Sequence, residues 1–499
     1  MRQTTLISLS AAALVALAGC NSFLTETPQD FFSPDNFPST EADLKIALGG
    51  IDNWYTGGSS QAYYIRGWPM ITEVPSDQTV ANNSSDSRYE QDSFTLNSGN
   101  EWLWRVWKQV YGAIGQANTI IERIPQMTGV SQDVKNRYLG AAKFHRALNH
   151  FNAVRVWGSV PLDTVAFHDF TAASDVTRAP IADVYASIAA DLESAVPLLP
   201  IKWPDSATPD DGRPTRGAAN ALLADVYLNM SGAIVKQNHW ADAARAAKAV
   251  IDSKAYSLVP SFASLWLVNN KNGPEHIYSI QFQGLIRNLF TSQSRPSGIG
   301  TESGINYWYT TPEFMNTFAN TDARKAVTFL TSVTVAGKTF SYTTFGDKRP
   351  RFPNPMPYYG KFYDNGGQSI ALNSGRSDLN WPVYRYAEVL LMYAEAQNEA
   401  VGPDASALAA LNQVRARAAL PALTGLSQAA FRDAVRQERS WELAFESKRL
   451  FDLKRWGTFY SVLSQDPVAK IGIQPYHVFL PIPQHEIDIN PNLGQNPGY

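Results

Sequence analysis

The chain has 499 residues and a formal net charge of −3, from 42 Lys and Arg against 45 Asp and Glu. No run of basic residues interrupts this balance, which argues against a nucleic acid partner. A single cysteine excludes an internal disulfide framework. Aromatic residues make up 12% of the chain, enough to supply both core packing and flat faces on which sugar rings could stack.

The first residues have the pattern of a secretory leader. Arg2 precedes an uncharged apolar run from Leu6 to Ala18, shorter than the about 20 residues that a membrane span needs. The run closes in the lipobox Leu17-Ala18-Gly19-Cys20, whose thiol receives diacylglycerol. We expect a signal peptide over residues 1–19, lipidation at Cys20 and a lipidated tether over residues 20–40. The alternative is a cleaved signal with an incidental cysteine.

The segment from about 57 to 100 has no helical period and is rich in Gly, Ser, Asn and aromatic residues. Long loops of this kind are usually functional or disordered, and the aromatic content argues for order. Flat rings beside planar polar groups suit sugar recognition. The alternative is that these side chains pack the loop onto a scaffold or face a partner. The candidate ligand-binding residues here are Tyr63, Tyr64, Arg66, Trp68, Asp77, Asn82 and Arg88.

Three tryptophans, Trp102, Trp104 and Trp107, follow this segment closely and could serve either as sugar platforms or as core residues. Trp107 shares a helical stripe with Leu103, Val110 and Tyr111, which predicts a core position, whereas Trp104 points to the other face. Trp240, Trp441 and Trp456 also lie in helical patterns and are predicted to be core residues.

Helical periodicity is clearest in four later segments. Small residues recur along them, and the breaker Gly402-Pro403 separates the last two. Paired helices of this kind resemble tetratricopeptide hairpins. The stripes consist of Ala219, Leu222, Leu223, Val226 and Tyr227, then Ala243, Ala244, Ala247, Val250 and Ile251, then Ala387, Leu390, Leu391 and Ala394, and finally Ala407, Leu411, Val414 and Ala418.

A second aperiodic insertion covers about 284–382. It combines aromatic and polar side chains in the same way as the first insertion. We therefore predict ligand contacts from Arg287, Asn288, Tyr307, Trp308 and Tyr309. If the tryptophans act as stacking platforms, Trp68→Ala and Trp308→Ala should each weaken ligand binding with little change in melting temperature.

Possible catalytic and metal-binding groups were weighed against structural roles. Glu438, Glu442 and Glu446 share one helix face, where two carboxylates could serve glycoside hydrolysis. Arg439 and Arg449 lie near in sequence, so a scaffold held by ion pairs is the preferred interpretation. His145 and His150 are five residues apart, which is the wrong spacing for a shared metal face. We predict no catalytic residue, no metal and no cofactor.

Several motifs in order along the chain carry a family resemblance. The C-terminal third contains Tyr384-Arg385-Tyr386-Ala387-Glu388, Glu438-Arg439, Asp452-Leu453, Arg455-Trp456-Gly457 and Phe479-Leu480-Pro481. The N-terminal half contains Trp157-Gly158-Ser159-Val160-Pro161-Leu162 and Pro214-Thr215-Arg216-Gly217. With the lipobox, this pattern resembles the SusD/RagB family of outer-membrane nutrient-binding lipoproteins.

The resemblance implies a mainly α fold over residues 41–499. It would contain about four tetratricopeptide-like hairpins, long irregular ligand-binding loops and little strand. It also implies a lipoprotein on the outside of the outer membrane that binds oligosaccharide and delivers it to a SusC-like TonB-dependent β-barrel transporter, without catalysis. The alternatives are a RagB-type protein that takes up peptides, a surface glycosidase using the Glu438–Glu446 face, and a repeat scaffold that gathers other surface proteins.

Overall fold

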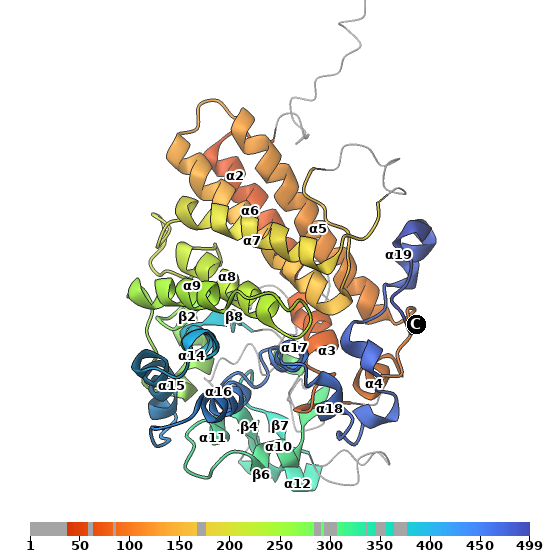
Figure 1. Cartoon of the computed structure of the whole chain (residues 1–499), viewed down its shortest axis with the longest axis vertical. Coiled ribbons are helices and arrows are strands. Elements are labelled where there is room, and N and C mark those ends of the chain that lie inside the picture. The colour runs from red at the N-terminus through yellow and green to blue at the C-terminus, as the bar shows by residue number, and fades with distance from the viewer. Residues whose placement is uncertain are drawn as a thin grey trace, which may run out of the picture.

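The computed structural model of the chain is mainly helical (Figure 1). It describes residues 37–57, 63–82, 86–166, 176–283, 291–293, 307–335, 337–345, 356–363 and 377–499. The predicted leader, Cys20, Arg287 and Asn288 lie outside the described residues.

Nine long helices within the described ranges form a stacked scaffold in which successive helices are neighbours. The first six pack in chain order, α2 on α5, α5 on α6, and so on to α9, and α14 then packs on α9 and carries α15 and α16 (Figure 1). Their bounds are α2 Glu41–Thr56, α5 Glu101–Arg123, α6 Gln132–Trp157, α7 Ile181–Leu198, α8 Arg216–Ser231, α9 Trp240–Asp252, α14 Tyr386–Val401, α15 Ala405–Arg417 and α16 Gln428–Glu442. The predicted tetratricopeptide-like scaffold is confirmed.

The predicted apolar stripes and the predicted breaker all fall on helices of this scaffold or at their ends. All four predicted stripes lie on α8, α9, α14 and α15, with Ala418 as the residue that caps α15. Thr215 caps α8 by accepting a hydrogen bond from Ala218 N, and Asp404 caps α15 in the same way. Gly402 ends α14 with a φ of 101°, a conformation that favours glycine, so the predicted breaker is confirmed.

Within the described residues, strand is confined to four two-stranded antiparallel ladders. They pair β1 (Thr79–Ala81) with β3 (Trp308–Thr310), β2 (His276–Ile280) with β8 (Trp381–Arg385), β4 (Phe329–Leu330) with β7 (Tyr358–Tyr359) and β5 (Ser332–Val335) with β6 (Lys338–Ser341). The prediction of little strand is confirmed. The β1–β3 ladder joins the two insertions to each other, and the β2–β8 ladder places the end of the second insertion beside the strand that follows α9.

The two insertions are more regular than the sequence predicts. The first contains a π-helical turn η1 (Tyr63–Gly67), α3 (Trp68–Thr72), β1 and α4 (Asp86–Ser93). Helices of one or two turns are too short to show an apolar period, which is why the sequence shows only an irregular loop. The remaining short elements are η2 Ile124–Gln126, η4 Phe262–Trp266, η5 Val268–Asn270, η6 Thr291–Gln293, α10 Pro312–Asn316, α11 Lys325–Thr328, α12 Tyr342–Phe345, α17 Arg449–Arg455, α18 Phe459–Leu463, η7 Ala469–Ile471, η8 Pro475–Val478, α19 Gln484–Ile489 and η9 Pro491–Leu493.

The hydrophobic core runs along the scaffold and continues beneath the insertions. Trp107 is 4% exposed and belongs to this core, as predicted, whereas Trp104 is half-buried on the other face of α5. Trp240, Trp441 and Trp456 are also half-buried, so their predicted core placement holds only in part. None of the described helices is both long and apolar enough to cross a bilayer.

Candidate ligand-binding site

The short β1–β3 ladder brings the two predicted ligand loops together. Ala81 pairs with Trp308 and Thr79 with Thr310. One residue beyond the ladder, the backbone N–H of Asn82 donates to the carbonyl oxygen of Tyr307 at 2.7 Å. The ladder therefore places candidates from both insertions at one site, although more than two hundred residues separate them in the chain.

Two arginines from the first insertion lie over the ring of Tyr307. The guanidinium carbon of Arg66 is 4.2 Å from the ring centroid and that of Arg88 is 4.0 Å from it. Arg66 Nε also donates to Gln293 Oε1 at 3.1 Å. Burial lowers the pKa of Arg66 to about 10, so the side chain stays charged near neutral pH. The result is a cationic, planar cluster of Arg66, Arg88 and Tyr307, which we call the Tyr307 cluster.

The other aromatic candidates are packed in the protein interior. Tyr63, Tyr64, Trp68 and Trp308 are each at most 3% exposed. The two tyrosine hydroxyls accept hydrogen bonds from Asn152 Nδ2, at 2.6 and 3.1 Å. With no free ring face, these four side chains fit the packing alternative. This burial argues against the expectation that Trp68→Ala and Trp308→Ala leave the melting temperature nearly unchanged, because each change would empty part of the core.

The remaining predicted residues have structural contacts of their own. Tyr309 is 2% exposed and its ring lies 5.2 Å from that of Tyr358. Asn82 is 4% exposed. Asp77 is less buried and forms a two-point ion pair with Arg449, with Nε–Oδ1 at 2.8 Å and Nη2–Oδ2 at 2.6 Å. This pair fixes the first insertion to the start of α17.

A groove of about 790 Å³ opens beside the β1–β3 ladder, and we call it the loop groove. Asp77 and Val80 form one wall, α10 supplies Phe314, and the segment from α18 to η7 closes the other side. The sequence interpretation missed most of its lining. Tyr89 directly follows the candidate Arg88, but Phe314 and Val468 carry no sequence signal that separates a groove wall from a core position. The lining residues are Asp77, Val80, Tyr89, Thr311, Pro312, Glu313, Phe314, Thr317, Met356, Val462, Gln465, Asp466, Pro467, Val468 and Ile471.

The carboxylates of Glu438, Glu442 and Glu446 are buried in ion pairs, but the prediction that all three share one helix face is wrong, because α16 ends at Glu442 and Glu446 lies beyond it. Glu438 Oε1 lies 2.7 Å from Arg324 and its Oε2 lies 3.0 Å from Arg415. Although burial alone would raise the pKa of Glu442, the guanidiniums of Arg417, Arg385 and Arg324 hold that pKa well below its usual range. The three glutamates are at most 3% exposed, so no glycosidic bond can lie between two of them.

These contacts fit a structural role for the three glutamates. The predicted partners, Arg439 and Arg449, are however wrong. Arg439 pairs instead with Asp452 at 2.9 Å, and Arg449 pairs with Asp77. The partners of the three glutamates come from elsewhere in the chain, and they are Arg324, Lys361, Arg385, Arg415 and Arg417. Arg385 and Arg417 also pair with Glu275.

The described part of the chain holds no cluster of three metal-ligating side chains. His145 Nδ1 shares a hydrogen bond with the hydroxyl of Tyr55 at 3.0 Å. His150 is 2% exposed, and burial lowers the pKa of both imidazoles to about 3. Both histidines are thus neutral core residues.

Comparisons with known proteins agree over both halves of the chain. Residues 299–499 match the model described as SusD family, and residues 33–228 match one described as starch-binding associating with outer membrane. SusD-like protein P2 of Formosa agariphila is 30% identical over 97% of this chain and 98% of its own length. A SusD superfamily protein from Parabacteroides distasonis has a TM-score of 0.80 at 27% identity, covering 92% of this chain and 98% of its own. A laminarin-binding SusD-like protein has a TM-score of 0.74 at 26% identity, over 92% and 99% of the two chains.

Proposed function

Because this chain belongs to the SusD family, we propose that it is a surface lipoprotein that binds an oligosaccharide and delivers it to a SusC-like TonB-dependent transporter. The family description already associates such proteins with the outer membrane. The solved relative that is named for laminarin binding supports a glycan as the ligand. Lipidation at Cys20 and an outward orientation belong to the same proposal and rest on the lipobox and the family.

The observation that carries the glycan proposal is the Tyr307 cluster beside the loop groove. Arg66 is only 5% exposed and donates to Gln293, so the half-buried Arg88 is the guanidinium of the cluster on which the proposal rests. A guanidinium donates several hydrogen bonds in one plane, which matches vicinal hydroxyls on a sugar. The groove adds the rings of Tyr89 and Phe314 and the carboxylates of Asp77 and Glu313. Apolar rings with a few polar groups at the rim are the usual composition of a sugar site.

Binding and release without bond cleavage complete the proposal. A glycosidase needs one carboxyl able to give a proton and a second one facing the same bond. The glutamates on α16 and just after it already accept from arginine and lysine and are closed to solvent. Their ion pairs support a structural role.

Isothermal titration calorimetry of the purified protein tests this function. We expect heat with a laminarin- or starch-derived oligosaccharide, and about tenfold weaker binding after Tyr307→Ala or Arg88→Ala, because each removes part of one stacked cluster. Arg245→Ala on the exposed side of α9 is the matched control and should leave affinity unchanged. Heat with a peptide panel alone would establish the peptide alternative, and heat with neither panel would overturn the proposal.

A further inference from the structure

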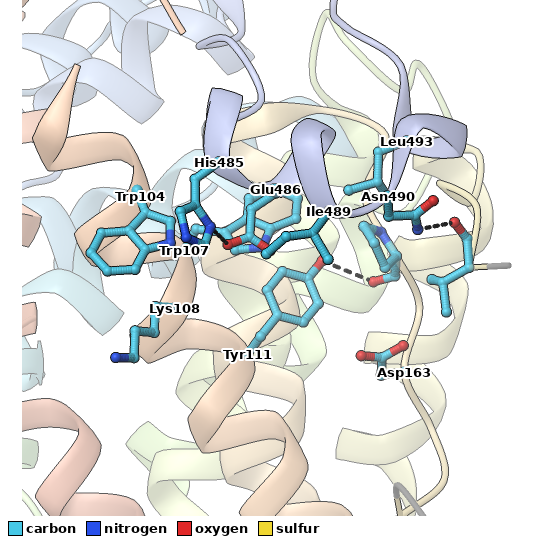
Figure 2. Close-up of a pocket in the computed structure, with 12 residues that line it drawn as sticks. Trp104, Trp107, Lys108, Tyr111, Asp163, His485, Glu486, Ile489, Asn490 and Leu493 are labelled. Atoms are coloured by element: carbon cyan, nitrogen blue, oxygen red, sulfur yellow. Dashed lines mark hydrogen bonds and ion pairs between the residues drawn. The ribbon is translucent and has the colours of Figure 1, made fainter. Parts of the chain in front are cut away.

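A second cleft, apart from the loop groove, lies between α5 and the C-terminal α19–η9 segment (Figure 2). Its volume is about 500 Å³. Sites for small molecules typically have about 300–1,000 Å³. Side chains of α5 form one wall, and those of α19 lie across from them (Figure 2). The lining residues are Trp104, Trp107, Lys108, Tyr111, Pro161, Asp163, Val176, His485, Glu486, Ile489, Asn490 and Leu493.

Aromatic rings form the walls of this cleft. The ring of Trp104 lies 4.8 Å from that of His485, with 43° between their planes. Trp107 and Tyr111 are also 4.8 Å apart. The Tyr111 hydroxyl donates to Pro161 O at 3.0 Å, which fixes this ring in place. These contacts give the cleft an aromatic surface in which the Tyr111 ring is held by its hydrogen bond.

Polar groups around these rings remain available. The carboxylate of Asp163 makes no hydrogen bond or ion pair with any residue in the described ranges, yet burial raises its pKa. The ammonium of Lys108 also makes no hydrogen bond or ion pair with a residue in the described ranges, and it lies over the Trp104 ring, 5.4 Å from Nζ to the centroid. A partly buried carboxylate without a partner favours a ligand that donates hydrogen bonds.

Ordinary core packing does not account for this arrangement. Trp102 and Trp107, on the same helix, are 3% and 4% exposed, whereas Trp104 is only half-buried. Lys108 and Ile489 are exposed at the edge of the cleft. One side of the aromatic surface is thus open to solvent, next to an acceptor and a donor.

We propose that the α5–α19 cleft is a second saccharide site, in which a neutral oligosaccharide stacks one sugar ring on Trp104 and gives a hydroxyl hydrogen bond from another ring to Asp163. The choice of a saccharide rests on the proposed function. The location rests on the cleft alone.

Hydrogen bonds connect the element that carries Arg88 to the helix that carries Trp104. Ser87 Oγ donates to Glu101 Oε1 at 3.1 Å, and Asn100 Nδ2 donates to Ser87 O at 2.9 Å. These bonds tie α4, which carries Arg88, to the first turn of α5, where Trp104 follows Glu101 by about 4.5 Å of helix rise. A long glycan that engaged both sites would gain affinity from the high effective concentration of its second segment.

Calorimetry with laminarihexaose, laminaribiose and maltohexaose tests the second site. In a Tyr307→Ala/Arg88→Ala background, we expect weak residual binding that Trp104→Ala or Asp163→Asn lowers by about tenfold or more. In the otherwise unchanged protein, the same two substitutions should reduce the ratio of the affinity for laminarihexaose to the affinity for laminaribiose. Trp240→Ala on α9 is the matched control, since it removes a half-buried tryptophan elsewhere. Thermal melting of each variant confirms folding.

The outcomes separate the two proposals. Glycan binding that Trp104→Ala and Asp163→Asn both leave unchanged overturns the second site and leaves the proposed function standing. A wild-type protein that binds no glycan overturns both. Residual binding that survives the loop variants and is lost with Trp104 supports the second site directly.

Discussion

Arg385 and Glu446 form a two-point ion pair inside the protein, with Nε–Oε2 at 2.8 Å and Nη2–Oε1 at 2.7 Å. Their side chains are 1% and 2% exposed. Arg385 is the last residue of β8, directly before α14, and Glu446 follows α16. The pair therefore joins the strand that leads into the second half of the scaffold to the segment that leads out of it. Lys361 Nζ reaches the same carboxylate at 2.9 Å.

Glu446→Ala should destabilise the protein by about 3–5 kcal/mol, because it leaves the buried charges of Arg385 and Lys361 without their shared partner. The free energy of unfolding from urea titration measures this loss. Asp252→Ala, which removes an exposed partner of Lys248, is the control and should unfold at the wild-type urea concentration. Equal midpoints for both variants would contradict the role given to the buried pair.

A second buried carboxylate predicts how stability depends on pH. Glu73 accepts hydrogen bonds from Ser447 N at 2.8 Å and Thr79 Oγ1 at 3.1 Å, but burial raises its pKa to about 7. Between its unfolded pKa of about 4.3 and its folded pKa, the folded protein holds one proton more than the unfolded chain. Protonation of Glu73 therefore adds to the free energy of unfolding. This stabilisation is complete below the unfolded pKa and is lost as the pH rises toward 7.

Glu73→Gln should remove the fall in stability that ionisation of Glu73 causes as the pH rises. The free energy of unfolding of wild-type protein should fall by up to about 3 kcal/mol between pH 4.5 and 7 because of this group, and the variant should lack this component. Urea titrations at intervals across this range compare the two slopes. Parallel slopes would show that Glu73 does not titrate there.

Trp308 and Tyr307 are neighbours in sequence, but we expect one substitution to act on stability and the other on ligand binding. Trp308→Ala should cost about 3–5 kcal/mol of unfolding free energy, because it empties a core position that is 3% exposed. Tyr307→Ala, one residue earlier and only half-buried, should cost less and act mainly on affinity. Differential scanning calorimetry and glycan titration of both variants check this contrast. A Trp308→Ala protein with the wild-type melting temperature would contradict the burial argument.

Sequence periodicity predicts the scaffold because each long helix repeats its apolar stripe over several turns. The stripe on α8 from Ala219 to Tyr227 shows this directly. The site is less predictable, because β1 and β3 have three residues each and form strands only by pairing with each other. Segments this short show no alternation in the sequence. An aromatic residue in an aperiodic segment looks the same whether it faces a ligand or the core. That is why Tyr307 and Trp308 belong to one predicted set and yet differ in burial.

Membrane attachment should depend on the single cysteine. Cys20→Ser removes the thiol that would carry diacylglycerol, and burial of acyl chains contributes about 0.8 kcal/mol for each methylene group. We expect the variant to leave the outer-membrane fraction, while Ser22→Ala, a control two residues away, stays in it. Fractionation followed by immunoblotting measures the partition. Retention of the Cys20→Ser protein in the outer-membrane fraction would refute lipid anchoring at this residue.

The ion pair of Asp77 with Arg449 should affect ligand affinity, because it holds one wall of the loop groove in place. Asp77 lines the loop groove, and its partner begins α17. The side chains are 24% and 17% exposed, so breaking the pair should cost only about 1 kcal/mol of stability. Arg449→Ala should nevertheless weaken glycan binding several-fold, because Arg449 does not line the groove but fixes the wall that does. A double-mutant cycle with Asp77→Ala should then show strong non-additivity in affinity. Additive losses, or an unchanged affinity for Arg449→Ala, would mean that Asp77 acts on the ligand without help from α17.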